Sequence, residues 1–387
     1  MLKGYVNVSR EARIFKADSG AFCALLIIVL IFAVSNIYFK EAAADTALLC
    51  ANILVPKIKI SFKTEAKKID TENSGKINSV NNILITDDSV APLASVSSEV
   101  YSTPQDILEL SKAYKEKYSN AQHDGKILEK TYDKTSATSV FKNITVRNTT
   151  SSHSINIEKS LNQEAKLSIS DKSKPTVLIF HTHTTESYQM TDEGWYTNSY
   201  PTRHNEKNQN MVRVGDAICK ELEKSGIGVI HDTEIHDAKY TGAYDNSRAT
   251  VEKILKENPT IQIVLDVHRD AIQQSDGTKI KPTFSFDGKK AAQLMIIAGC
   301  EDGKVKDFPN WAQNLTFALQ IHQKTETMFP TMMRPILFSA RKYNMDVVPC
   351  SVLLEFGSDS NTLAEAEYSG HLFGKALAAY IEEKTGE

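Results

Sequence analysis

Short runs of apolar, β-branched residues recur through the second half of the chain, and a segment with helical spacing follows most of them. Such near-continuous runs are typical of strands that are buried on both faces of a parallel sheet. We predict strands over residues 176–182, 227–231, 261–267, 292–298 and 350–356, and helices over 209–225, 245–257, 308–326 and 362–384. This alternation favours an α/β fold over 175–387, with a mostly parallel sheet covered by helices.

A charge-free apolar stretch, Ala21–Phe39, lies near the N-terminus. As a helix it would reach about 28 Å, close to the hydrocarbon thickness of a bilayer, so we predict one transmembrane helix. Lys3, Arg10, Arg13 and Lys16 precede it, and Lys40 follows it. This asymmetry predicts a single-pass protein of the cytoplasmic membrane, with residues 1–20 in the cytoplasm and the catalytic part outside. A cleaved signal peptide, cut within Ala42–Ala44, is the alternative.

The region between this stretch and residue 175 is mostly polar. Residues 40–103 are rich in Ser, Asn, Thr and Lys, and we predict a linker there. We expect residues 104–174 to form a small, partly ordered module, with a helix within 104–125 and strands within 137–150.

Composition narrows the chemistry of the protein. A net charge of −3 gives no reason to expect binding to nucleic acid. The five cysteines are scattered and form no CxxC pair, which argues against a disulfide framework or a cysteine-ligated metal. Any metal would therefore bind to histidines and carboxylates.

Three predicted strands end at residues that can bind a metal or transfer a proton. His183 and Glu186 follow the first strand, His268 follows the third, and Glu355 ends the last. We expect these side chains to meet, because ligands of open α/β sheets gather beyond the carboxyl ends of the strands. Catalytic zinc takes three protein ligands and leaves one position open. The set predicts a zinc hydrolase.

Two of these ligands have alternatives. His181 lies two residues before His183, and an extended chain would direct both to the same side. Glu206 opens the helix that begins EKNQNMVRVG, where a carboxylate suits the helix dipole. We expect the metal ligands to be His183, Glu186 and His268, with His181 as the alternative histidine and Glu206 as the alternative carboxylate.

Two further residues are candidates for catalysis. Glu355 would take a proton from water and pass it to the leaving amine; the alternative is an ion pair with Arg269 or Arg341. Arg269 would bind a substrate carboxylate or a developing oxyanion. Asp270 would orient His268, although a structural ion pair is as good an interpretation of both residues.

Other polar segments are weaker candidates. The sequence HDTEIHD (231–237) would suit a second metal site, but we favour a polar loop. Tyr240, Tyr244 and Arg248 follow it and are candidates for the lining of the cleft.

The motifs HTHTTESY, VGDAICKELEKSGIGVIHD, DVHRDA and LLEFGSDSNT, in this order, resemble the stage II sporulation protein P family over about residues 175–385. The resemblance implies a peptidoglycan hydrolase related to zinc N-acetylmuramoyl-L-alanine amidases, with endopeptidase activity on stem-peptide cross-links. It implies action around a developing endospore during engulfment, with stage II sporulation proteins D and M as partners. In the related amidases two histidines and a glutamate bind zinc, which implies His183 and His268 as ligands here and Glu355 as the base.

Two other functions fit the same residues. One is a zinc carboxypeptidase that trims stem peptides, since such an enzyme also uses HxxE and a second histidine as ligands and a separate glutamate for catalysis. The other is a wall-binding scaffold without catalytic activity, which would have no need for stoichiometric zinc.

Overall fold

The computed structural model describes residues 101–386. The predicted membrane span, Ala21–Phe39, and the predicted linker up to residue 100 lie outside this range. Within the described range, every helix is either too short or too polar to cross a membrane.

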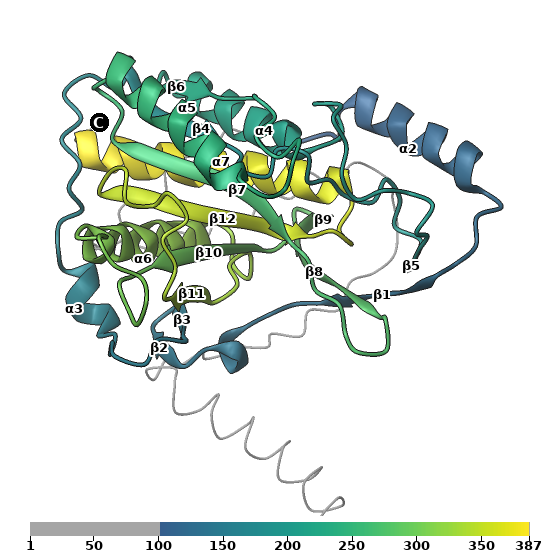
Figure 1. The fold of residues 1–387 in the computed structure, drawn as a ribbon, viewed down its shortest axis with the longest axis horizontal. Coiled ribbons are helices and arrows are strands. Elements are labelled where there is room, and N and C mark those ends of the chain that lie inside the picture. The colour runs from purple at the N-terminus through teal and green to yellow at the C-terminus, as the bar shows by residue number, and fades with distance from the viewer. Residues whose placement is uncertain (1–100, 387) are drawn as a thin grey trace, which may run out of the picture. The chain divides into compact units, whose positions relative to one another are not determined.

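An eight-stranded sheet forms the centre of the fold (Figure 1). Its strands, in spatial order, are β2 (Ser139–Phe141), β3 (Ile144–Asn148), β11 (Ile336–Ser339), β10 (Leu294–Gly299), β12 (Cys350–Ser358), β7 (Ile263–Asp270), β4 (Pro175–Phe180) and β6 (Gly228–His231). The pairs from β12 through β7 and β4 to β6 are parallel, as predicted. However, β10 runs antiparallel to β12, and β2 antiparallel to β3, so the sheet is mixed.

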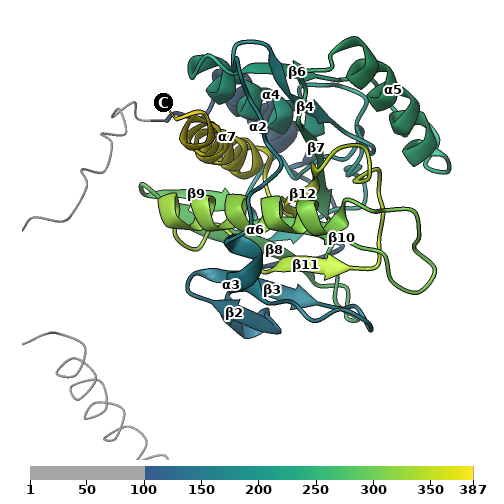
Figure 2. The ribbon, with the colours of Figure 1, turned by 90° about the vertical axis from the view of Figure 1, so that its left-hand side faces the viewer.

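Helices cover both faces of this sheet, as the alternating pattern predicted. Figure 2 shows α4 (Met211–Lys224), α6 (Trp311–Met328) and α7 (Leu363–Thr385) on one side and α5 (Ala243–Glu257) on the other. Successive side chains of a strand point to opposite faces of the sheet, so each strand contributes to the apolar core on both sides. Val177 and Ile179 of β4 join the core under α4 and α7, whereas Leu178 and Phe180 pack with Val251 of α5. Burial on both faces explains why these strands read as continuous apolar runs.

Local signals fix where the helices that follow the site begin. The side chain of Asn210 accepts a hydrogen bond from the backbone N–H of Val212 at the start of α4. At the start of α7, Thr362 and Glu365 form a capping box, each bonding the backbone N–H of the other. These caps satisfy N–H groups that have no partner within a helix, so each helix begins at a defined residue.

A second, four-stranded sheet was not predicted. Its strands, in spatial order, are β5 (Trp195–Tyr196), β1 (Gly125–Lys130), β8 (Lys279–Phe286) and β9 (Lys289–Ala292). The buried ammonium of Lys281 on β8 holds it together, with Glu129 of β1 at 3.1 Å, Asp192 at 2.5 Å and Glu365 of α7 at 3.0 Å.

Residues 104–174, which we predicted to form a module of their own, contribute strands to both sheets. Strand β1 pairs with β8, and β3 pairs with β11. The segment also forms α2 (Gln105–Tyr118), a 3₁₀ turn (Lys134–Ser136) and α3 (Ile157–Leu161). Buried Ile107, Ile144 and Val146 belong to the same core as α4, α6 and α7. The segment therefore packs as part of the same compact unit.

Candidate metal and catalytic centre

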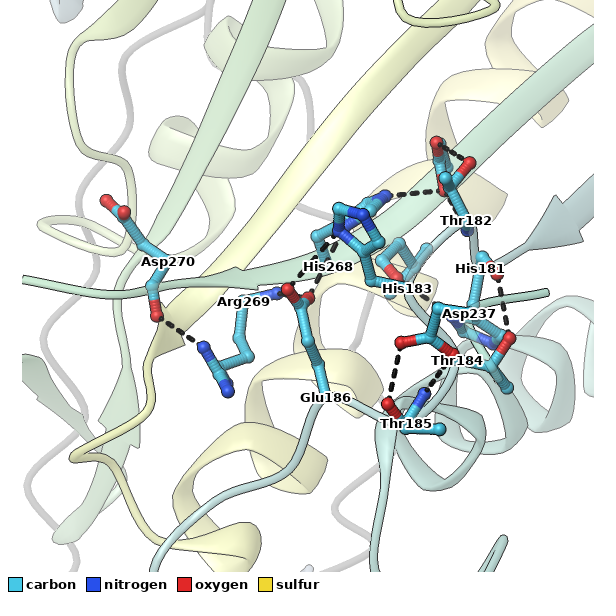
Figure 3. A network of polar contacts seen from close by, with 12 residues as sticks. His181, Thr182, His183, Thr184, Thr185, Glu186, Asp237, His268, Arg269 and Asp270 are labelled. Carbon is cyan, nitrogen blue, oxygen red and sulfur yellow. Dashed lines mark hydrogen bonds and ion pairs between the residues drawn. The ribbon is translucent and has the colours of Figure 1, made fainter. Parts of the chain in front are cut away.

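The loop that follows β4 presents two of the predicted ligands. It turns at once, with the backbone N–H of Glu186 bonded to the carbonyl oxygen of His183 at 3.0 Å. Three threonine hydroxyls fix the loop to neighbouring elements (Figure 3). The hydroxyl of Thr182 donates a hydrogen bond to Asp266 (2.8 Å), that of Thr184 to the carbonyl oxygen of Glu234 (2.7 Å) and that of Thr185 to Asp237 (2.6 Å). The run of threonines thus gives this loop one conformation.

His183 and Glu186 follow β4, His268 lies near the carboxyl end of β7, and the three buried side chains meet there (Figure 3). One ligand atom of each lies within 4.8 Å of the others. Nδ1 of His183 is 3.4 Å from Oε1 of Glu186, and Nδ1 of His268 is 3.3 Å from Oε2. The two imidazole rings stand at 87° to each other. The sequence prediction that these three side chains converge is therefore confirmed.

The electrostatics of this group depend on its buried carboxylates. Burial alone would raise the pKa of Glu186, but hydrogen bonds from His183 and His268 and the charge of Arg269 outweigh it and hold that pKa well below its usual range. Burial would likewise lower the pKa of His268, yet the charge of Asp266 keeps it well above the usual value. An ionised carboxylate thus stands between two imidazoles.

The donor set fits zinc. Two imidazole nitrogens and one carboxylate oxygen are the ligands of many catalytic zinc sites, which keep a fourth position free. A histidine that binds zinc commonly gives its other nitrogen to a carboxylate, which fixes the ring. Here Nε2 of His268 lies 2.7 Å from Oδ1 of Asp266, and the same carboxylate accepts from the backbone N–H of Thr182 at 2.9 Å.

The alternative ligands lie elsewhere. His181 is fully buried, and its Nδ1 donates to the carbonyl oxygen of Val267 at 2.8 Å while its Nε2 contacts Nε2 of His231 at 2.9 Å. Glu206 is exposed, and its ion-pair partner is His204, at 3.7 Å. Neither belongs to the group that His183 forms in the described part of the chain.

Glu355 lies beside this group, in register with His268 on the adjacent strand. Its Oε2 atom is buried and has no hydrogen-bond partner within residues 101–386. Burial raises the pKa of Glu355 to about 8, with the charge of His268 opposing this rise. The predicted alternative, an ion pair with Arg269 or Arg341, does not occur. A buried carboxyl oxygen without a partner is costly to keep, and a role in proton transfer accounts for it.

Gly357 shapes the strand just after Glu355. The register between β12 and β7 shifts between Glu355 and Ser358, and Gly357 adopts a φ of +65° there. A Cβ atom at this position would lie 2.4 Å from Oδ1 of Asn361, so only glycine fits. The irregularity ends the regular pairing at the residue that carries the candidate base.

The structure gives Arg269 and Asp270 partners within the protein, in line with the structural alternative for both residues. The Arg269 side chain is buried and donates to the carbonyl oxygens of Ser187 (2.9 Å) and Thr202 (2.8 Å). It thus fixes the loop that carries Glu186 and is not available for a substrate. Asp270 pairs with Arg334 at 3.1 Å, and it is Asp266 that contacts His268. The sequence did not indicate these partners, because the carbonyl oxygens of Ser187 and Thr202 and the side chain of Arg334 come near only in the folded chain.

Aromatic side chains surround His183. The ring of Tyr240, which is 67% exposed, stacks on His183 at 4.9 Å, and Tyr244 meets it edge-on at 5.6 Å. Arg248 instead pairs with Glu252 and Asp346. Asp232, Glu234 and His236 form a second group with metal-binding atoms, in which His236 and Asp232 are paired at 2.8 Å.

The sequence did not indicate two residues that contact the metal-binding group. Asp266 lies two residues before His268 in the same strand and hence on the same face, a signal that could have identified it. Arg203 bridges Glu186, at 3.3 Å, and Asp237, at 2.6 Å. It comes from a loop whose position the sequence does not indicate.

Comparison with known proteins identifies the family. The family model for stage II sporulation protein P matches residues 91–378. The chain belongs to the stage II sporulation protein P family. It is similar to stage II sporulation protein P of Bacillus subtilis (strain 168), with 30% identity over 206 residues. The match covers 50% of this chain and 48% of the relative, so the chain spans about half the length of the curated relative it matches.

Solved structures with some similarity to this member of the stage II sporulation protein P family are much more distant in sequence. The N-acetylmuramoyl-L-alanine amidase from Clostridium difficile 630 has 14% identity and a TM-score of 0.33, over 56% of this chain and 98% of that one. For amidase AmiC2 of Nostoc punctiforme the identity is 11% and the TM-score 0.32, over 55% and 98%.

Proposed function

We propose that this protein is a zinc-dependent peptidoglycan hydrolase that cleaves the amide bond between muramic acid and the first residue of the stem peptide. Endopeptidase activity on stem-peptide cross-links belongs to the same proposal. The observation that carries it is the convergence of His183, Glu186 and His268 beside Glu355, whose buried Oε2 atom has no hydrogen-bond partner among the described residues. Membership in the stage II sporulation protein P family supports a role in sporulation.

His183, Glu186 and His268 would hold the metal. When bound, zinc would polarise the scissile carbonyl group and make water more acidic. The protein residues have separate tasks. Glu355 accepts a proton from the attacking water and delivers it to the nitrogen that leaves. Asp266 holds the His268 ring in position, and Arg269 fixes the loop that carries Glu186.

The proposal extends to the place of action. We propose that the protein is anchored by Ala21–Phe39 in the cytoplasmic membrane, with its catalytic part in the space around the forespore during engulfment. Stage II sporulation proteins D and M are the expected partners, and peptidoglycan is the substrate. Protease added to intact protoplasts should digest the catalytic part; full protection of that part would refute this topology.

Product analysis tests the activity. Full-length protein is incubated with purified peptidoglycan, and the fragments are analysed by mass spectrometry. An amidase releases whole stem peptides with a free amino-terminal alanine. Release of single amino acids would instead indicate a carboxypeptidase, and the absence of any product would indicate a scaffold.

Metal content tests the site separately. Elemental analysis should find about one zinc per wild-type chain and much less in His183→Ala and His268→Ala. His123→Ala, at an exposed position away from the site, is the matched control and should keep its zinc. Full zinc content in both site variants would refute the ligand assignment.

A further inference from the structure

The phenol of Tyr244 is a polar group at this site to which the proposed mechanism gives no task. Tyr244 lies in the first turn of α5, the helix that covers the same face of the sheet as the metal-binding group. Its ring meets the His183 ring edge-on, with the centroids 5.6 Å apart. The side chain is thus directed toward the residues that would hold the metal.

The hydroxyl of Tyr244 has no hydrogen-bond partner among the described residues. The side chain of Tyr244 is half-buried. A phenol is protonated at neutral pH and can donate a hydrogen bond. A donor that has no partner within the protein and lies beside the metal-binding group is free to bond a substrate that enters the site.

The position of the ring is fixed from its other side. Tyr343, in the loop between β11 and β12, stacks on Tyr244 with centroids 4.9 Å apart and planes within 11°. Tyr343 and Asn344 both adopt left-handed backbone conformations, with φ of 43° and 57°. The Asn344 amide holds this turn on α5 by donating to the carbonyl oxygen of Tyr244 (3.0 Å) and to Ser247 (3.1 Å). Two successive strained residues point to a functional demand on this turn.

We propose that the hydroxyl of Tyr244 donates a hydrogen bond to the carbonyl oxygen of the scissile amide and stabilises the negative charge that develops there. This inference rests on the proposed function. As water adds to the carbonyl carbon, the electrons of the C=O bond move onto oxygen, and Tyr244 bonds that oxygen without giving up its proton. The C–N bond then breaks, and Glu355 returns the proton of water to nitrogen, which leaves as the amine.

The surroundings favour Tyr244 over the other donors near the site. Arg269, which we predicted to stabilise the oxyanion, bonds backbone carbonyl oxygens instead. Tyr240 also contacts His183, but its side chain is largely exposed, where water would weaken a hydrogen bond. Tyr244 combines a hydroxyl without a partner among the described residues, a half-buried side chain and a ring held between His183 and Tyr343, features that favour such a donor.

The test is Tyr244→Phe in the full-length protein, which keeps the ring contacts with His183 and Tyr343. We expect kcat on a soluble muropeptide to fall by about 10²–10³, the usual effect of removing one such donor, with little change in KM. Zinc content should stay at the wild-type level. A phosphinic peptide, whose tetrahedral group replaces the scissile amide, should bind at least about tenfold more weakly.

Tyr380→Phe is the matched control, since it removes a tyrosine hydroxyl that donates to Gln320 at 2.8 Å, far from the site. It should leave kcat and phosphinic peptide affinity unchanged. Wild-type kcat in Tyr244→Phe, or a loss of zinc from it, would overturn the inference while the proposed function stands. A wild-type protein that cleaves no muropeptide would overturn both.

Discussion

Acidification should destabilise this fold through one buried histidine. His322 lies in α6 with 1% of its surface exposed, and neither ring nitrogen has a hydrogen-bond partner in the described part of the chain. Burial lowers the pKa of His322 to about 4 from its usual value of about 6.5, and the nearby backbone of Arg334 opposes this only in part. The folded protein therefore holds this ring neutral at pH values where the unfolded chain would bind a proton.

The sign and size of the effect follow from this difference. Because the unfolded state binds the proton more tightly, stability is unaffected above pH 6.5 and falls as the pH drops from 6.5 to 4. From these pKa values the loss is about 2 kcal/mol at pH 5 and about 3 kcal/mol at pH 4. This is a large part of the stability of a typical domain.

Urea denaturation of wild type and His322→Leu between pH 7 and pH 5 measures the effect. Leucine cannot titrate, so the free energy of unfolding of wild type should fall by about 2 kcal/mol more than that of the variant. Any change in packing adds a constant that cancels between the two pH values. His123→Gln, an exposed position, should behave like wild type. The reasoning would be refuted if the free energies of unfolding of wild type and His322→Leu differed by the same amount at pH 7 and at pH 5.

Three further predictions concern the site. Glu355→Gln should retain zinc and lower amide hydrolysis by about two to four orders of magnitude, and near-wild-type turnover would exclude Glu355 as the base. Glu186→Gln should lose zinc, whereas Glu206→Gln should keep it; elemental analysis showing the reverse would make Glu206 the ligand. Arg269→Ala removes three hydrogen bonds to backbone carbonyl oxygens and should lower the unfolding free energy by about 1–3 kcal/mol, measured by urea denaturation. An effect of Arg269→Ala confined to KM would instead support direct substrate binding.

Local sequence was enough to find the strands that carry the site. Each is buried on both faces, which produces an apolar run, and the polar residue at its end stands out. Strand direction is not encoded in this way: nothing in residues 292–298 distinguishes a parallel strand from the antiparallel β10. The four-stranded sheet was missed because its strands are short or polar, and β8 includes a buried lysine and a proline.

The same limit applies to the site. The spacing of His183 and Glu186 indicated the candidate ligand group, because a short turn brings the two together regardless of the rest of the fold. The partners of Arg269 and His268 depend on loops and strands that meet only after folding. Sequence therefore identified the residues that could bind a metal but not those that hold them in position.

The strands that residues 104–174 add to both sheets affect how this protein tolerates truncation. A chain cut at Pro175 would keep His183, His268 and Glu355, yet it would leave the edges of β8 and β11 without their neighbours. The cut would also expose the apolar surface that Ile144 and Val146 cover. The buried ammonium of Lys281 would lose its ion pair with Glu129. Unpaired strand edges beside exposed apolar side chains favour aggregation. Proteolysis near this boundary would thus inactivate the protein while every residue of the site remained on one fragment.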